Sequence, residues 1–230
     1  GTDVAKEASD MVLLDDNFAT IVNAVEEGRT VYGNVRKFIT YFFTSNVAEL
    51  VPYIVYMLFR VPLPLTIMQI LAVDLGTDLL PGLALGAEKP TKEIMKQKPR
   101  SPKDSLLNAR VLRLAFLFLG PIEAVAGLFG FFYVLKLSGW QGEMLPANNM
   151  LYMQATTACL TGIVVAQIAN VFACRSSSES VFSIGFFSNK LIFAGIAFEI
   201  ALQIFIVYHP LGNKIFGTYP ISLSAWLVLI

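Results

Sequence analysis

Apolar stretches long enough to cross a lipid bilayer recur along most of this chain, with short polar stretches between them. A helix that spans a bilayer needs about 20 mostly apolar residues. The pattern predicts five complete spans and the start of a sixth, at residues 31–59, 65–86, 111–137, 150–173, 191–208 and 221–230. The short alternating segments that are typical of a transmembrane β-barrel do not occur. We therefore expect an all-α, polytopic membrane bundle.

The first thirty residues have a different pattern. Residues 2–9 have a helical pattern, and the run Met11–Asp15 is apolar and of strand length. Asn17 can cap a helix from Phe18 to Gly28. A helix, a strand and a helix in so short a space are typical of the end of an α/β unit. We expect residues 1–30 to be an α/β remnant of a cytoplasmic domain, and residues 31–230 to be the transmembrane domain.

The distribution of charge predicts which loops face the cytoplasm. The formal net charge is zero, which suggests no nucleic-acid partner. Basic residues concentrate near the start of the first span and between the second and third spans, and such loops stay in the cytoplasm. The predicted cytoplasmic segments are 1–36, 87–110 and 174–190, and the predicted outer segments are 60–64, 136–149 and 209–219. The lysines of residues 87–110 could instead bind lipid, but we favour orientation and docking onto a soluble domain.

Neither the cysteines nor the histidine indicate a metal site. Cys159 and Cys174 lie in one apolar segment, about four helical turns apart, so they cannot pair with each other. His209 precedes Pro210 at the end of a span, where we expect an interfacial loop residue. The chain starts at Gly1 without a methionine and ends inside an apolar run, as expected of a piece of a longer protein.

The second span contains an unusual set of polar groups. Asp74 and Asp78 are four residues apart and Thr77 is three from Asp74, so a regular helix places all three on one face. Each carboxylate costs roughly 2.5–3.5 kcal/mol near the bilayer centre on insertion scales. Pro81 has no N–H for the Thr77 carbonyl, and Gly76 weakens the same turn. Such oxygen-rich groups suit hard cations. The alternative is a structural seam, by which we mean a row of polar side chains that only joins helices.

The first span adds two further oxygen ligands. Asn46 and Glu49 are three residues apart and share a helical face, and Pro52 frees the carbonyl of Ala48. Because residues 60–64 form a short loop, the second span must return antiparallel beside the first. We therefore expect Asn46 and Glu49 to lie within reach of the polar groups of the second span.

The later spans contain isolated polar residues whose roles stay open. Gln167 and Asn170 can be cation ligands or can hydrogen-bond between helices, and Glu199 can line a proton or cation path. Glu123 can snorkel, join helices or take part in function. Gly127 and Gly130 allow a close helix approach.

Three classes of function fit these features. Transport requires polar groups that cluster at one depth, whereas a channel requires a continuous polar lining. A membrane-anchoring bundle would not need the acids Glu49, Asp74 and Asp78. The clustering favours a transporter with an occluding site, and an ion channel or a non-transporting helical bundle is the alternative.

Several motifs, in order along the chain, resemble the P-type cation ATPases. Residues 1–10 (GTDVAKEASD) and 15–18 (DDNF) resemble the end of their phosphorylation domain. Residues 44–49 (TSNVAE) and 74–78 (DLGTD) resemble their fifth and sixth transmembrane segments, and residues 99–103 (PRSPK) resemble the loop that follows. The resemblance covers essentially the whole chain and points to the type II branch, which includes sodium/potassium and calcium pumps.

The resemblance implies a function that no spacing shows by itself. ATP phosphorylates an aspartate in the family's soluble domains, and the membrane helices then alternate between two access states. By motif, the family's cation ligands match Asn46, Glu49, Asp74, Thr77 and Asp78, and residues near its sites match Tyr41, Ser45, Gln167, Asn170 and Glu199. ATP and magnesium would be bound by nucleotide, actuator and phosphorylation domains that this chain lacks, so we expect no catalytic residue here.

The transported ion is not fixed by the resemblance. The aspartate at position 74 is the residue type that resembles the sodium pump, whereas the asparagine at position 170 resembles the calcium pump. The alanine at position 48 matches neither pump. We expect sodium or another monovalent cation such as potassium, with calcium next. The family's first four transmembrane segments would complete the site, and an accessory subunit cannot be assigned.

Overall fold

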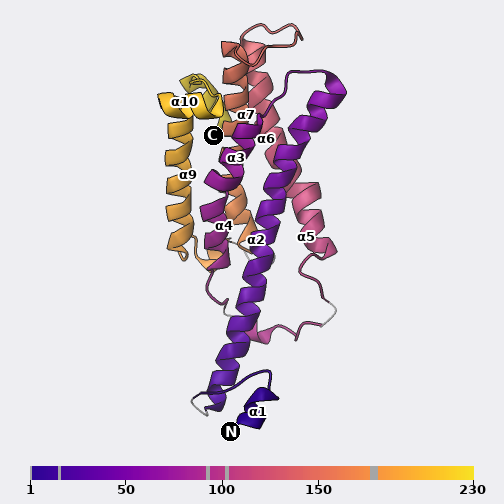
Figure 1. Cartoon of the computed structure of the whole chain (residues 1–230), viewed down its shortest axis with the longest axis vertical. Coiled ribbons are helices and arrows are strands. Elements are labelled where there is room, and N and C mark those ends of the chain that lie inside the picture. Colours follow the sequence, from indigo (N-terminus) through magenta and orange to yellow (C-terminus); the bar gives the residue numbers. More distant parts are fainter. Residues whose placement is uncertain (1, 15–16, 92–93, 102–103, 177–180) are drawn as a thin grey trace.

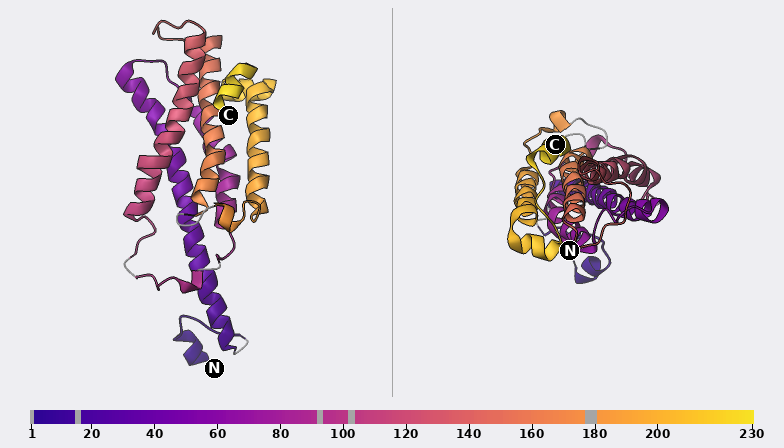
Figure 2. Two further views of the ribbon diagram at one scale, coloured as in Figure 1. Left: turned by 180° about the vertical axis from the view of Figure 1, so that it is seen from behind. Right: turned by 90° about the horizontal axis from the view of Figure 1, so that it is seen from above.

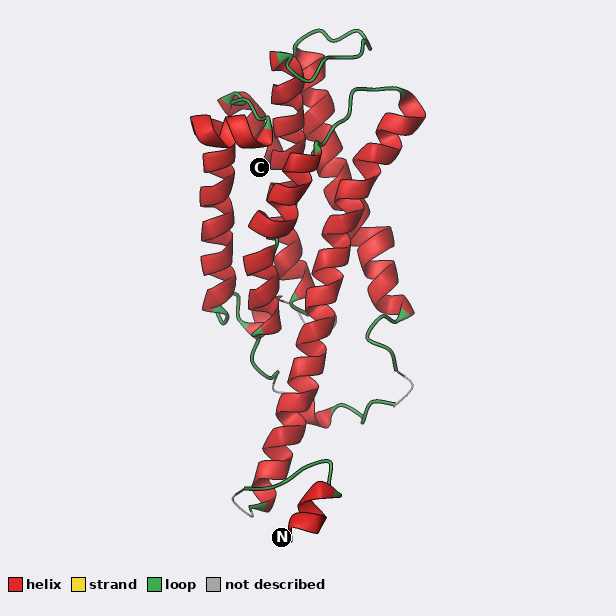
Figure 3. Cartoon of the chain, viewed as in Figure 1, coloured by secondary structure: helices red, strands yellow, loops and turns green. Residues whose placement is uncertain are grey.

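The computed structural model describes residues 2–14, 17–91, 94–101, 104–176 and 181–230 as a bundle of helices (Figures 1 and 2). These ranges contain helices and loops but no strand (Figure 3). In these ranges, five helices are long and apolar enough to cross a membrane: Phe18–Phe59, Ile67–Gly86, Ala109–Leu137, Met150–Cys174 and Lys190–Tyr208. The prediction of a polytopic helical membrane protein is thereby confirmed.

Two of the five spans are divided by π-helical turns. In chain order the elements are α1 (Asp3–Glu7), α2 (Phe18–Phe59), α3 (Ile67–Ala72), η1 (Val73–Thr77), α4 (Leu79–Gly86), η2 (Ile94–Lys96), α5 (Ala109–Arg113), η3 (Leu114–Leu119), α6 (Gly120–Leu137), α7 (Met150–Cys174), α8 (Val181–Ile184), α9 (Lys190–Tyr208), α10 (Pro210–Phe216) and α11 (Leu223–Leu229). Of these, η1 and η3 are π-helices and η2 is a 3₁₀-helix. The predicted outer loop after the fifth span therefore contains a short helix, α10, and α11 occupies the predicted start of the sixth span.

The predicted α/β remnant at the N-terminus is wrong. Residues 11–14 form no strand, and the side chain of Leu14 is 98% exposed. A strand needs hydrogen-bonding partners beside it, and the described residues offer none. Asp15, the last residue of that apolar run, lies outside the described residues.

The first span and the helix before it form one continuous helix, α2. Asn17 caps its start as predicted, because the Asn17 side chain accepts a hydrogen bond of 3.0 Å from the backbone N–H of Ala19. The pattern predicted a break after Gly28, but a glycine inside a helix costs only about 1 kcal/mol. At 1.5 Å per residue α2 is about 63 Å long, roughly twice the thickness of a bilayer core. Its first part extends beyond the rest of the bundle (Figure 1).

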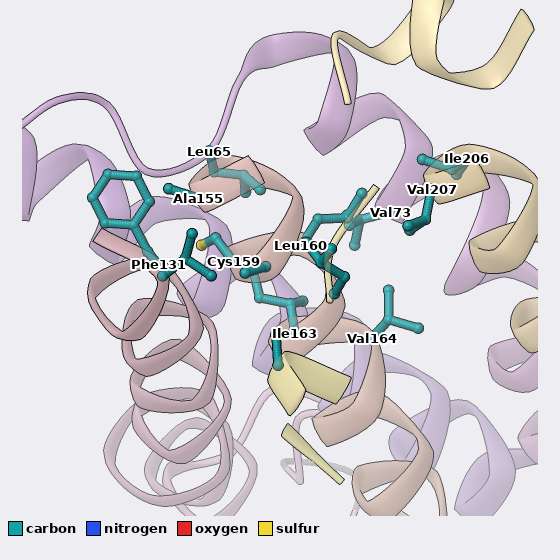
Figure 4. Close-up of a cluster of buried hydrophobic side chains, with 14 of the residues drawn as sticks. Leu65, Val73, Phe131, Ala155, Cys159, Leu160, Ile163, Val164, Ile206 and Val207 are labelled. Atoms are coloured by element: carbon teal, nitrogen blue, oxygen red, sulfur yellow. The ribbon is translucent and has the colours of Figure 1, made fainter. Parts of the chain in front are cut away.

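The hydrophobic core is built around α7, which packs closely against α6. Leu160, Ile163 and Phe131 are fully buried in this core (Figure 4). Gly162 faces the backbone of α6 and Gly130 faces the backbone of α7, so neither position has room for a Cβ atom. The close approach predicted from the glycines of the third span is thus confirmed.

A buried ion pair joins several helices at the end of the bundle nearest the N-terminus, which we call the inner end. The guanidinium of Arg175 lies 2.7 Å from a carboxylate oxygen of Glu88, and both side chains are buried. Arg175 also donates to the hydroxyl of Ser188, and Asn189 donates to Glu88. Asn34 of α2 donates to the backbone carbonyl of Glu88. These contacts hold the ends of α4, α7 and α9 against α2.

The segment between the second and third spans lies along the inner part of α2. The Arg29 guanidinium donates to the carbonyls of Ile94 and Gln97, both at 2.9 Å. The guanidinium of Arg100 lies over the ring of Tyr32, 3.9 Å from its centroid. The segments predicted to be cytoplasmic end up together at the inner end, and those predicted to face outward lie at the opposite end (Figure 1).

Candidate functional site

Polar side chains from the five spans meet inside the bundle, away from both ends. Those that are buried are Tyr41, Thr44, Ser45 and Glu49 of α2, Thr77 and Asp78 of the second span, Glu123 of α6, Gln167 and Asn170 of α7, and Glu199 of α9. Apart from Asn46, the predicted residues of the first, second, fourth and fifth spans are therefore brought together. Glu123, whose role the sequence also left open, lies with them and comes from the third span.

A π-helical turn shapes the acidic segment of the second span. The N–H of Asp78 donates to the carbonyl of Val73, five residues earlier, at 2.9 Å. A π-turn holds more residues than an α-turn, so side chains four apart no longer fall on one face. Thr77 and Asp78 are fully buried, whereas Asp74 is partly exposed. The prediction that a regular helix places Asp74, Thr77 and Asp78 on one face is therefore wrong.

A chain of hydrogen bonds runs between four helical elements. The Thr77 hydroxyl donates to the Gln167 side-chain carbonyl at 3.0 Å, and the Gln167 amide donates to the Ser45 hydroxyl oxygen at 2.7 Å. Ser45 in turn donates to one carboxylate oxygen of Glu123 at 3.3 Å. The Asn170 amide donates to the other oxygen of Glu123. Gln167 and Asn170 therefore do form interhelical hydrogen bonds, one of the two roles that the sequence left open.

Other buried oxygens in the same region have no hydrogen-bond partner among the described residues. They are both carboxylate oxygens of Asp78, both of Glu199, one of Glu49, and the hydroxyl of Tyr41. A buried polar group without a partner costs about 1–3 kcal/mol, and a charged one costs more. These oxygens are chemically suited to bind a hard cation.

Within the described part of the chain, no ion pair with a basic side chain neutralises these acids. The sequence has no lysine or arginine between residues 38 and 59, 61 and 88, 114 and 135, or 137 and 174. Electrostatic interactions connect Glu49 with Asp74 and Asp78, and Glu199 with Asp78 and Glu123. Even so, no group of three or more acidic, cysteine or histidine side chains within the described ranges stands close enough to hold a metal ion by itself.

The predicted ligands of the first span differ in their surroundings. Glu49 is buried and interacts with the two aspartates of the second span, as the antiparallel return predicted. Asn46 is exposed on the surface of this chain, so it does not share the environment of Glu49. Tyr41 and Ser45 are polar neighbours of the Asp78 carboxylate.

Further buried polar contacts were not predicted from the sequence. The Gln203 amide donates to the Thr161 hydroxyl at 2.9 Å, and the Gln69 amide donates to the Thr156 hydroxyl at 3.2 Å. Gln203 follows Glu199 by four residues and so lies on the same face of α9. That spacing is the signal that could have identified it.

A cleft of about 670 Å³ opens at the inner end, but its chemistry differs from that of the buried acids. Its lining contains one acid, Asp104, and eight basic residues: Arg29, Arg36, Lys37, Lys89, Lys98, Arg100, Arg110 and Arg175. Such a lining attracts anions and repels cations. We therefore assign the candidate cation site to the buried polar cluster and not to this cleft.

Comparison with known proteins places these features in a family. The family model of the cation-transporting ATPase C-terminus matches residues 62–230. The chain is 37% identical over 98% of its length to a sodium/potassium-transporting ATPase subunit alpha-1 from Catostomus commersonii. It is 38% identical over 99% of its length to a subunit alpha from Hydra vulgaris, and 36% identical over 98% to a human subunit alpha-3.

These relatives are much longer than this chain. The chain spans about a quarter of their length, 24% of the Catostomus commersonii protein and 25% of the human one. The region matched by the family model includes the membrane helices that hold Asp78, Glu123 and Glu199. The chain thus belongs to the P-type cation-transporting ATPases and corresponds to the C-terminal membrane part of that family.

Proposed function

We propose that this chain is the membrane part of an ATP-driven cation pump. Cations would bind between its helices and move by alternating access, coupled to aspartyl phosphorylation in other parts of a longer protein. ATP and magnesium would be bound in those parts. Residues 1–30 would connect to the phosphorylation domain, and residues 31–230 would form the transport domain.

The observation that supports this proposal is the burial of Asp78 without a hydrogen-bond partner in the described part of the chain. Its side chain is 0% exposed and both of its carboxylate oxygens have no partner among the described residues. An isolated carboxylate in a membrane interior is costly and marks ion pathways in other membrane proteins. A seam that only joins helices would use its carboxylate oxygens in hydrogen bonds, as Glu88 does with Arg175 and Asn189.

The cation ligands would come from Glu49, Thr77 and Asp78, with Asp74 at the edge of the site. Asn46 and the exposed side of Asp74 would face ligands supplied from outside this chain. Lower-ranked ligands are Tyr41, Ser45, Gln167, Asn170 and Glu199. The absence of a complete metal cage within the described residues fits a site that needs such additional ligands.

Sodium or another monovalent cation is the preferred substrate, with calcium next. Two points support this order: the names of the similar proteins, which specify sodium and potassium, and the aspartate at position 74. A channel or a non-transporting bundle would make the same helices but would not couple cations to phosphorylation.

The test measures phosphoenzyme formation from ATP in the intact pump that contains this chain, with titrations of sodium and of calcium. We expect cation-dependent phosphorylation, and a half-activating concentration that rises in Asp78→Asn and in Asp74→Asn. Loss of one charged contact is worth about 1.5–3 kcal/mol, or roughly 10- to 150-fold in concentration. The larger effect should belong to Asp78, because it is more deeply buried.

Glu143→Gln is a matched control, because it removes an exposed acid from the outer loop. Unchanged half-activating concentrations in both aspartate variants would show that the aspartates of the second span only join helices and do not bind the cation. Phosphorylation that does not respond to any cation would overturn the pump function.

A further inference from the structure

Glu123 is a buried acid of the third span, and the family ligand set does not contain it. It lies on α6, two residues after Pro121, and its side chain is 0% exposed. A snorkelling role requires the charged end to reach water or headgroups, so complete burial excludes it. The remaining roles are joining helices and taking part in cation binding.

Local structure places Glu123 where α6 meets α2. The π-turn η3 ends at Leu119, directly before Gly120 and Pro121. A Cβ atom at Gly120 would collide with Val47 of α2, so a glycine there lets the two helices approach closely. Glu123, one helical turn beyond Gly120, then reaches Ser45 on α2.

The partners of Glu123 are hydrogen-bond donors without charge. Ser45 donates to one of its oxygens and Asn170 donates to the other. The sequence has no lysine or arginine between residues 114 and 135, so α6 supplies no countercharge near it. Hydrogen bonds of this kind satisfy the oxygens, but they leave the charge of a buried carboxylate uncompensated.

Two further acids face the same interior. Asp78 and Glu199 are both fully buried, and none of their carboxylate oxygens has a partner among the described residues. The charges of both interact with that of Glu123. The Ser45 hydroxyl donates its hydrogen bond to Glu123, and both oxygens of Asp78 are without a partner among the described residues and so can bind a ligand.

We propose that Glu123 is a specificity-determining residue of the cation site, where it supplies part of the negative charge that balances a transported cation held near Asp78 and Glu199. The inference rests on the proposed pump function. It differs from a helix-joining role in one respect: it requires the charge of Glu123 and not only its shape.

The experiment compares charge-removing and charge-moving variants in the intact pump, by phosphoenzyme formation from ATP against sodium and calcium. Glu123→Gln keeps the shape and removes the charge, and we expect the half-activating concentration to rise roughly 10-fold or more. The energy of a charge interaction scales with the charge of the ion, so the logarithm of the shift for calcium should be about twice that for sodium.

The double variant Glu123→Gln/Asn170→Asp moves the carboxylate across one hydrogen bond, from α6 to α7. The pair keeps its hydrogen bond with donor and acceptor exchanged, since a Gln amide can donate to an Asp carboxylate. We expect it to recover much of the affinity that Glu123→Gln loses. Glu143→Gln serves as the control for loss of an acid elsewhere.

Each result decides between the roles. Normal cation activation in the wild type with no shift in Glu123→Gln would overturn the inference and leave the pump function standing. Equal shifts for both ions, without recovery in the double variant, would also overturn it, because a purely structural role predicts that pattern. A wild type without cation-dependent phosphorylation would overturn the pump function and this inference together.

Discussion

The buried acids in the described part of this chain have two opposite environments, one with a basic partner and one without. Glu88 is paired with Arg175 at 2.7 Å and accepts further hydrogen bonds, so its charge is balanced within the protein. Asp78 and Glu199 have neither a basic partner nor a hydrogen bond among the described residues. The first arrangement fixes helices in place, whereas the second leaves oxygens that can bind a ligand. The same side-chain chemistry therefore has a structural role at the inner end and a candidate binding role in the middle of the bundle.

Removal of Arg175 should destabilise the protein strongly. In Arg175→Ala, Glu88 is left buried without its partner, and breaking a buried pair in this way costs about 3–5 kcal/mol. Arg175→Lys should cost less but not be neutral, because a lysine cannot reproduce the two contacts that the guanidinium makes with Glu88. Thermal unfolding of the detergent-solubilised pump measures both changes. The interpretation fails if Arg175→Ala unfolds at the wild-type temperature.

At the level of elements, glycines decide how closely the helices pack. Gly162 and Gly130 stand opposite backbone atoms of the neighbouring helix, where a Cβ atom would collide. Backbone atoms cannot move aside as a flexible side chain can. The close contact of α6 with α7 is also what brings Glu123 to Asn170. A packing requirement of the helices thus controls a polar contact in the candidate site.

Gly162→Ala should therefore destabilise the bundle, by about 1–3 kcal/mol if the helices must separate slightly. Gly33→Ala is a matched control within a helix, because nothing lies within 4 Å of a Cβ atom at that position. Alanine is favoured over glycine in helices, so the control should be neutral or stabilising by up to about 1 kcal/mol. Thermal unfolding of both variants tests the comparison, and equal effects would show that the α6–α7 contact tolerates extra volume.

At the scale of the whole molecule, the two ends of the bundle differ in composition and in structure. The inner end carries the basic loops, the long extension of α2 and the Arg175–Glu88 pair, whereas the outer end carries short loops and α10 (Figure 1). Basic residues on one side of the membrane predict that this side is cytoplasmic. A soluble domain can then dock on the inner end, where the loop after the second span lies against α2.

This orientation is tested by labelling cysteines introduced at Ser101 and at Met144, which are both exposed. A membrane-impermeant thiol reagent should reach Ser101→Cys only from the cytoplasmic side and Met144→Cys only from the outer side. The native cysteines, Cys159 and Cys174, are free and buried, and the parent protein without introduced cysteines measures their background. Reaction of both introduced cysteines from the same side would contradict the proposed topology.

The isolated 230-residue chain should not hydrolyse ATP. Its predicted role is to bind cations, and no phosphate-binding loop or phosphorylation motif was identified in its sequence. Release of inorganic phosphate from ATP by the purified chain, with and without sodium or calcium, measures this. Cation-stimulated hydrolysis that persists after removal of contaminating ATPases would prove the expectation wrong.

The sequence by itself determined the helices and their order. Apolar runs of about 20 residues have one stable arrangement in a bilayer, because a helix satisfies every backbone hydrogen bond within itself. The acids inside those runs identified the polar cluster, because charge in a membrane segment is costly enough to be informative. Local pattern failed at residues 11–14, because a strand exists only if another strand pairs with it.

Only the tertiary structure decided which oxygens face one another. The π-turn after Ala72 turned Asp78 inward and left Asp74 partly exposed, which a regular helical period does not predict. Glu123 was ambiguous in the sequence, and its burial depends on how closely α6 packs against α2. Contacts between helices depend on packing over the whole bundle, whereas sequence periodicity reports only on the surface of one helix.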